Sequence, residues 1–119
     1  MQQALAITLL EIDQMPLFRE HFARLRQESG RDGLHFMPFT PGAPEGPKGP
    51  DPFGFTLALT ELSWARCFAL WNENGSAIIG HVDLTGSPLT TMLHRCVLGI
   101  GIEAAWCGKG EGQRLLRAA

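Results

Sequence analysis

The chain has 119 residues, a hydrophobic content of 45%, a charged content of 18% and a formal net charge of −2. This length is enough for one domain with a small core, and the composition is that of a globular protein. The slightly acidic charge balance gives no electrostatic reason to expect a nucleic acid or an anionic membrane as a partner.

The cysteines and the N-terminus indicate a reducing compartment. Cys67, Cys96 and Cys107 are odd in number and lack CxxC spacing, so they predict neither a disulfide framework nor a zinc site. The apolar run at residues 4–10 has no basic segment before it and leads directly into acidic residues, unlike a signal peptide. No stretch approaches the roughly 20 apolar residues of a membrane span. The expected location is therefore the cytoplasm.

A strand followed by a helix is predicted at the N-terminus. Residues 4–12 alternate loosely between apolar and polar side chains and favour a strand. Asp13 can cap a helix that has Pro16 in its first turn. The residues after it recur at helical spacing and form one stripe: Leu17, Phe18, His21, Phe22, Leu25 and Arg26. The Ser29-Gly30 pair is expected to end this helix.

Prolines and glycines dominate the next segment, residues 37–54. Six of the eight prolines lie between Pro38 and Pro52, and such a sequence forms neither regular helix nor sheet. We expect a surface loop, and a loop bordering an acceptor-substrate cleft is the functional alternative. Residues 55–62 are then expected to make one or two helical turns.

A β-hairpin and a further strand follow. Residues 65–71 and 77–84 are predicted strands, joined by a turn at residues 72–76 with Asn74-Gly75 at its centre. The sequence Thr-Gly-Ser-Pro at 85–88 ends the second strand, and residues 94–102 form the third. The predicted order is strand, helix, loop, short helix, hairpin, strand, glycine loop and helix.

Three alternating glycines, Gly108, Gly110 and Gly112, follow the last strand and precede a helix-like segment. Glycines at every second position let backbone N–H groups converge without Cβ clashes, and at a helix start they favour an anion. A Walker A loop does not fit, because Gly108-Lys109 is followed by glycine rather than by serine or threonine. A dinucleotide fingerprint, GxGxx[GA], matches residues 99–104, but the later glycines would break the helix that it requires.

The segment 107–112 (Cys-Gly-Lys-Gly-Glu-Gly), after the apolar strand 98–102, resembles the coenzyme A loop of the GNAT-type (Gcn5-related) N-acetyltransferases, where the pattern is [QR]xxGx[GA]. The order of the other elements agrees with about the first two-thirds of that family's domain. The resemblance implies an α/β (α+β) fold with a mixed, mostly antiparallel sheet and flanking helices, in the order β-α-(α)-β-β-β-α. It also implies one incomplete domain over residues 1–119, truncated before the family's C-terminal strands.

The resemblance further implies acetyl-CoA-dependent transfer of an acetyl group to a primary amine of a small molecule or peptide. The last strand would lend backbone groups to the pantetheine arm, and the loop amides would hold the pyrophosphate at the positive end of the helix. The implied cofactor-binding residues are Ile100, Ile102, Cys107, Gly108, Lys109, Gly110, Glu111, Gly112 and Gln113. Glu103 is the candidate catalytic base, and an exposed loop-edge carboxylate is its alternative interpretation.

Several departures from the family's pattern are visible. Cys107 stands where Arg or Gln is usual and Glu111 stands where an aliphatic residue is usual, so we expect weaker cofactor binding than in relatives. The sequence has no tyrosine to protonate the departing thiolate. The strand at residues 94–102 is left as an apolar sheet edge that a second copy of the chain can pair with. A non-catalytic CoA-binding or assembly module is therefore the alternative function.

Other polar side chains have simpler expected roles. His81 and Asp83 share one strand face and either line the acceptor cleft or face solvent. His94 and Cys96 alternate in the same way but lack a second close ligand pair, so no metal is expected. Cys107 lacks an assignable histidine for nucleophilic catalysis. The charged residues of the N-terminal helix are expected to form a solvated face: Arg19, Glu20, Arg24 and Arg26.

Overall fold

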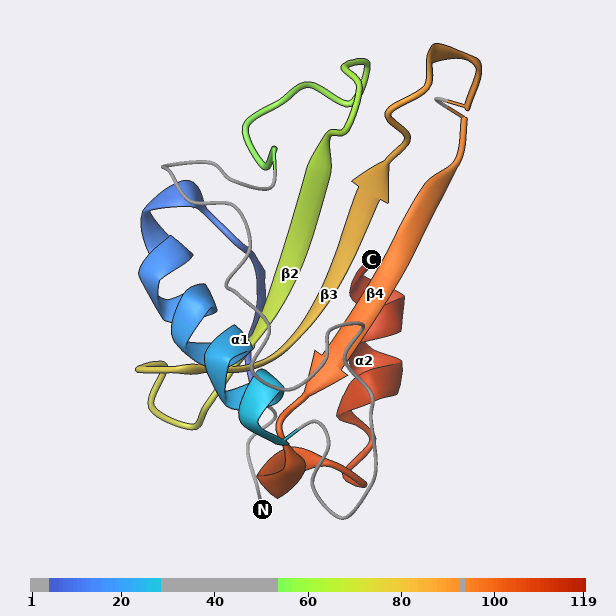
Figure 1. Cartoon of the computed structure of the whole chain (residues 1–119). Coiled ribbons are helices and arrows are strands. Elements are labelled where there is room, and N and C mark those ends of the chain that lie inside the picture. Colours follow the sequence, from blue (N-terminus) through green and yellow to red (C-terminus); the bar gives the residue numbers. More distant parts are fainter. Residues whose placement is uncertain (1–4, 29–53, 93) are drawn as a thin grey trace.

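In the computed structural model, which describes residues 5–28, 54–92 and 94–119, four strands form one antiparallel sheet in the order β1-β2-β3-β4 (Figure 1). The strands are β1 (Ile7–Leu9), β2 (Ala65–Trp71), β3 (Ile78–Gly86) and β4 (Cys96–Ile102). The helices are α1 (Met15–Glu28) and α2 (Glu111–Ala118), with 3-10 turns η1 (Ile12–Gln14), η3 (Thr90–Met92) and η4 (Ala104–Trp106). The predicted α+β class is confirmed.

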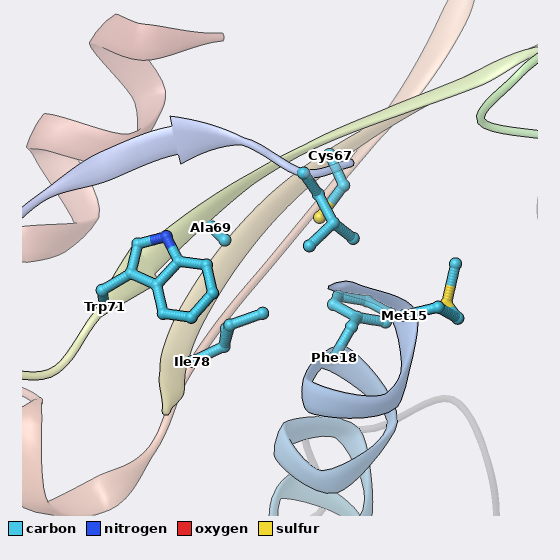
Figure 2. Packing of buried hydrophobic residues seen from close by; sticks show 7 residues of the cluster. Met15, Phe18, Cys67, Ala69, Trp71 and Ile78 are labelled. Atoms are coloured by element: carbon cyan, nitrogen blue, oxygen red, sulfur yellow. The ribbon is translucent and has the colours of Figure 1, made fainter. Parts of the chain in front are cut away.

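The two helices pack on opposite faces of the sheet, because side chains alternate between the faces along each strand. On one face, Met15 and Phe18 of α1 pack against the cluster that Figure 2 shows, formed by Leu10, Cys67, Ala69, Trp71 and Ile78. On the other face, Leu115 of α2 packs against Leu70, Ile79 and Val82. The core therefore consists of two apolar layers with the sheet between them.

The helix α1 follows the predicted stripe. Pro16 occupies its second position, where the missing N–H costs no intrahelical hydrogen bond. Met15, Phe18, His21 and Leu25 are buried, at the spacing of one helical face. One polar residue, His21, thus lies among the buried positions of the stripe.

The first strand is shorter than the sequence predicts. It covers Ile7–Leu9 rather than residues 4–12, because the chain turns into the 3-10 helix η1. The Gln14 side chain bonds back to the Glu11 amide at 3.0 Å, which fixes this turn. The Glu11–Gln14 capping box therefore ends the extended segment before residue 12.

The helical turns expected at residues 55–62 are not formed, and the segment makes turns instead. The Arg66 guanidinium on β2 donates to the carbonyls of Phe55 and Leu57, at 2.9 and 2.7 Å. These carbonyls would otherwise accept the intrahelical bonds of a first turn. A long side chain from the neighbouring strand thus overrides the local helical propensity.

The predicted hairpin is confirmed, and its second strand is longer than expected. The turn places Gly75 at a φ of 71°, a conformation that suits glycine. The strand β3 continues to Gly86, because Thr85 and Gly86 both keep partners in the sheet. β4 begins at Cys96 and, among the described residues, pairs with β3 alone. Its outer edge has no strand neighbour in this part of the chain.

Two sequence predictions lie partly or wholly outside the described residues: the helix end at Ser29-Gly30 and the loop at residues 37–54. The proline- and glycine-rich segment expected as a loop falls outside the described residues except for Gly54. The boundaries predicted for the domain stay a prediction. In the parts of the chain that are described, neither helix has the length and apolarity that crossing a membrane requires.

Candidate functional site

The chain passes from β4 through the 3-10 turn η4 into the glycine loop, residues 107–110, and then into α2 (Figure 1). Gly108 and Gly110 have φ values of 77° and 80°, which glycine adopts without a Cβ penalty. Gly110 is the N-cap residue of α2. All four loop residues are exposed. The strand, loop and helix that the sequence predicts therefore occur in succession.

The backbone amides at the start of α2 are available to a ligand. Arg114 is the first residue of the helix whose N–H finds a backbone acceptor, the Gly110 carbonyl, at 3.4 Å. Among the described residues, no acceptor is bound to the amides of residues 108–113. These amides lie at the positive end of the helix dipole, which favours an anion.

The outer edge of β4 leads directly to this loop. The Glu103 N–H donates to the Ile79 carbonyl at 2.9 Å, so it points toward β3. Because backbone groups alternate in direction along an antiparallel strand, those of Ile100 and Ile102 face the outer edge. The Ile100 side chain is 44% exposed. The two strand residues predicted to bind the cofactor therefore lie on the edge of β4 that no other described strand pairs with.

Two side chains of residues 107–113, those of Glu111 and Cys107, form hydrogen bonds with neighbouring groups. The Glu111 carboxylate is bound by Arg114, with 2.6 Å between Oε2 and Nη1, and Arg114 also donates to the Leu5 carbonyl at 2.6 Å. This pairing offsets part of the negative charge that Glu111 places at the start of α2. The Cys107 thiol donates to the Ile102 carbonyl at 3.4 Å. Lys109 and Gln113 are exposed, and Gly112 is half-buried.

A polar cluster lies beside the loop: His21, His81 and Glu103 are buried, and Arg24, whose side chain is 40% exposed, joins them from α1. The Glu103 Oε2 lies 2.7 Å from the His21 Nδ1, and its Oε1 accepts from the Arg24 Nε at 2.7 Å. The His21 Nε2 in turn lies 2.8 Å from the His81 Nδ1. Glu103 is only 4% exposed. The interpretation of Glu103 as an exposed carboxylate is therefore wrong, whereas Arg24, expected on a solvated face, is partly exposed and pairs with Glu103.

The hydrogen bonds of this cluster define one direction of donation. An ionised carboxylate can only accept a hydrogen bond. The proton of neutral His21 therefore lies on Nδ1, and this N–H donates a hydrogen bond to Glu103. The Nε2 of neutral His21 is then an acceptor, and the Nδ1–H of His81 donates to it. A single chain of hydrogen bonds thus runs from β3 through α1 to the residue after β4.

Both histidines are held in the neutral form. Burial lowers the pKa of His21 to about 3, and the charge of Arg24 acts in the same direction. Burial also lowers the pKa of His81 to about 4, with repulsion from His21 adding to it and the Asp83 carboxylate opposing it. His81 is 5% exposed, so the expectation that it faces solvent or a cleft is wrong.

Close packing around the cluster leaves no room for a side chain at Gly101 of β4. A Cβ at Gly101 would lie 3.0 Å from the His81 Cε1 and 2.9 Å from the Leu25 Cδ1. Arg24 also donates to the Ile78 carbonyl at 2.9 Å. The helix α1 is therefore joined to β3 and to the residue after β4 by polar contacts as well as by apolar ones.

The other polar candidates are not gathered into a site. His94 and Cys96 are exposed, whereas Cys67 is buried, and burial together with the Asp83 charge raises its thiol pKa well above the usual range. No group of three His, Cys, Asp or Glu residues in the described ranges is placed to hold a metal ion. The dinucleotide fingerprint at residues 99–104 is also excluded as a phosphate loop, because Gly99 and Gly101 lie within β4 and only the three-residue 3-10 turn η4 follows, not the α-helix that the fingerprint requires.

The sequence interpretation missed the partners of Glu103. The signal for His21 was its place in an otherwise apolar stripe, since a buried imidazole needs a hydrogen-bond partner. No local signal distinguishes Arg24 from the other charged residues of α1. No protein-family model matches this chain, and comparisons with curated proteins and with solved structures gave no significant match.

Proposed function

We propose that the chain binds acetyl-CoA along the outer edge of β4 and at the glycine loop, and transfers its acetyl group to a primary amine. One observation carries this proposal: the outward-facing backbone of Ile100 and Ile102 leads directly to the available amides of residues 108–113. A pantetheine arm carries amide groups that can pair with a strand edge, and a pyrophosphate suits a helix start. The order β1-α1-β2-β3-β4-α2 supports the GNAT-type resemblance.

The proposed reaction is attack of the amine nitrogen on the thioester carbonyl. A C–N bond forms and the C–S bond breaks, while the ammonium loses a proton and the thiolate gains one. Glu103 is the proposed base. Each of its oxygens already accepts one hydrogen bond but keeps a second lone pair, so it can receive the amine's proton through a water molecule.

A non-catalytic CoA-binding or assembly module is the second candidate. The burial of Glu103 and the absence of tyrosine from the sequence favour it, because both remove groups that would handle protons at the thioester. Release of free thiol from acetyl-CoA in the presence of a panel of amines separates the two functions. Cofactor binding without thiol release would assign the chain to the module.

The binding site is tested by titration calorimetry with acetyl-CoA on the wild type and on Gly110→Ala. Alanine at a φ of 80° costs about 1–2 kcal/mol in that conformation, so the loop should shift and affinity should fall about tenfold. Gly75→Ala is the matched control, because Gly75 also has a positive φ and open surroundings but lies in the turn between β2 and β3 and not in the proposed site. Equal affinity of the two variants would contradict the proposed site, and no binding by the wild type would contradict the proposed function.

A further inference from the structure

Two buried histidines link parts of the fold that meet beside the glycine loop. His21 lies on α1 and His81 on β3, and their hydrogen-bond chain ends at Glu103, the first residue after β4. The same helix makes a second contact with this segment, where the Glu28 carboxylate accepts a hydrogen bond of 3.0 Å from the Ala104 N–H. We call residues 103–106, which begin at Glu103 and lead to the loop, the corner. The corner is thus held by α1 as well as by the sheet.

This chain of hydrogen bonds accommodates one additional proton but not two. When His21 is protonated on Nε2, its Nδ1 still donates to Glu103, and His81 accepts if its own proton moves to Nε2. When both rings are protonated, the His21 Nε2–H and the His81 Nδ1–H point at each other across 2.8 Å. Two imidazolium rings with centroids 5.0 Å apart then repel as well.

The surrounding charges do not offset this repulsion. From α1, Arg24 adds a positive charge and already occupies one Glu103 oxygen. From β3, the Asp83 carboxylate favours a charged His81, but it faces one ring only. The remaining neighbours include Phe18 and Phe22, whose ring centroids lie 5.4 and 6.2 Å from that of His81. Apolar rings of this kind do not solvate a charge.

We infer that His21 and His81 form a two-proton latch on the corner, which is closed when both rings are neutral and open when both carry a proton. Opening releases Glu103 and Ala104 from α1 and separates the Glu103 N–H from the Ile79 carbonyl of β3, so the start of the glycine loop is released with them. The claim that the latch regulates cofactor binding rests on the proposed function. The claim that the latch attaches the corner to α1 rests only on the contacts of the four side chains.

The size of the effect follows from proton linkage. In the open state the two histidines regain ordinary pKa values near 6.5, whereas in the closed state burial lowers the pKa values of His21 and His81 to about 3 and about 4, so both rings stay neutral down to pH 5. Between pH 7.5 and pH 5, each histidine then increases the opening constant about 30-fold, and the pair increases it about 1,000-fold. A single titrating histidine gives only the smaller factor.

Amide hydrogen exchange of the full chain without ligand measures this opening constant, after correction for the intrinsic pH dependence of exchange. The reporter is the Glu103 amide, and the reference is the Leu10 amide, which donates to the Cys67 carbonyl near the β1 edge of the sheet, opposite β4. We expect the Glu103 opening constant to rise about 1,000-fold from pH 7.5 to pH 5, with the Leu10 value unchanged. An equal rise at both amides would show global unfolding and overturn the latch.

His81→Asn is the informative variant, because the asparagine amide can occupy the place of the Nδ1–H donor but does not titrate. The rise at the Glu103 amide should fall to about 30-fold in this variant. His94→Asn is the matched control, since His94 is exposed, and it should keep the full 1,000-fold rise. The same factor in His81→Asn as in the wild type would overturn the inference.

Nitrogen NMR of the wild-type histidines gives a second measurement that needs no variant. Both neutral rings should carry their proton on Nδ1 at pH 7, and both should titrate together well below pH 6. An Nε2–H tautomer of His21 at pH 7, or titration of either ring near pH 6.5, would overturn the latch. Acetyl-CoA binding is measured separately at pH 7.5, so failure of the proposed function leaves these results interpretable.

Discussion

Replacement of Glu103 by glutamine tests the buried polar cluster with almost no change in shape. The carboxylate accepts two charge-assisted hydrogen bonds of 2.7 Å, from His21 and from Arg24, and Glu103 is 4% exposed. A glutamine keeps one acceptor oxygen and presents an NH₂ group to the other partner. Arg24 can only donate, so the oxygen turns to Arg24 and the NH₂ faces His21, whose Nδ1 must then become an acceptor.

The energetic cost follows from these exchanges. A hydrogen bond to a charged group contributes about 1.5–3 kcal/mol and a neutral one about 1 kcal/mol. The bond to Arg24 stays partly charged and the bond to His21 becomes neutral, so Glu103→Gln should destabilise the fold by about 2 kcal/mol. For a domain of this size the corresponding fall in Tm is about 10 °C.

Urea unfolding followed by tryptophan fluorescence measures this difference. Glu73→Gln is the matched control, because Glu73 lies exposed in the hairpin turn, and its stability should stay within about 0.5 kcal/mol of the wild type. NMR of the His21 ring should also show its proton on Nε2 in Glu103→Gln and on Nδ1 in the wild type. A Glu103→Gln protein as stable as Glu73→Gln would refute the charged cluster.

Three further outcomes are expected. Gly101→Ala should destabilise by about 1–3 kcal/mol in urea unfolding, because its Cβ would press on His81, whereas Gly112→Ala should not, since its Cβ has ordinary contacts; equal effects would argue against the packing. Glu111→Ile should raise acetyl-CoA affinity in calorimetry by removing a carboxylate beside the pyrophosphate, and an unchanged or lower affinity would count against this reasoning. Iodoacetamide at pH 7.5 should modify the two exposed cysteines while sparing Cys67, since burial raises its thiol pKa; mass spectrometry showing rapid triple modification would contradict this.

Local sequence patterns predict the elements whose stability is decided locally. The strand β2 (Ala65–Trp71) has its predicted bounds, and α1 has its predicted stripe, because strand and helix periods are visible within a few residues. The turn at Gly75 follows from an Asn-Gly pair. The helix expected at residues 55–62 fails for a non-local reason, namely the capture of its carbonyls by Arg66.

The polar cluster could not be predicted, because its members are distant in the sequence. Glu103 binds His21 across 82 residues and Arg24 across 79. The period of two places His81 on one face of β3, but nothing in the sequence says which helix covers that face. The glycine loop was visible for the opposite reason, since its glycines and the helix after it are adjacent in the chain.

Amide chemical shifts on titration with acetyl-CoA test the central claim most directly. The account predicts that the shifts concentrate at residues 108–113 and at Ile100 and Ile102, because those backbone groups would bind the pyrophosphate and the pantetheine arm. The amides of β1, at the opposite edge of the sheet, should not change. No shifts at millimolar acetyl-CoA, or shifts confined to other parts of the sheet, would contradict the proposed site.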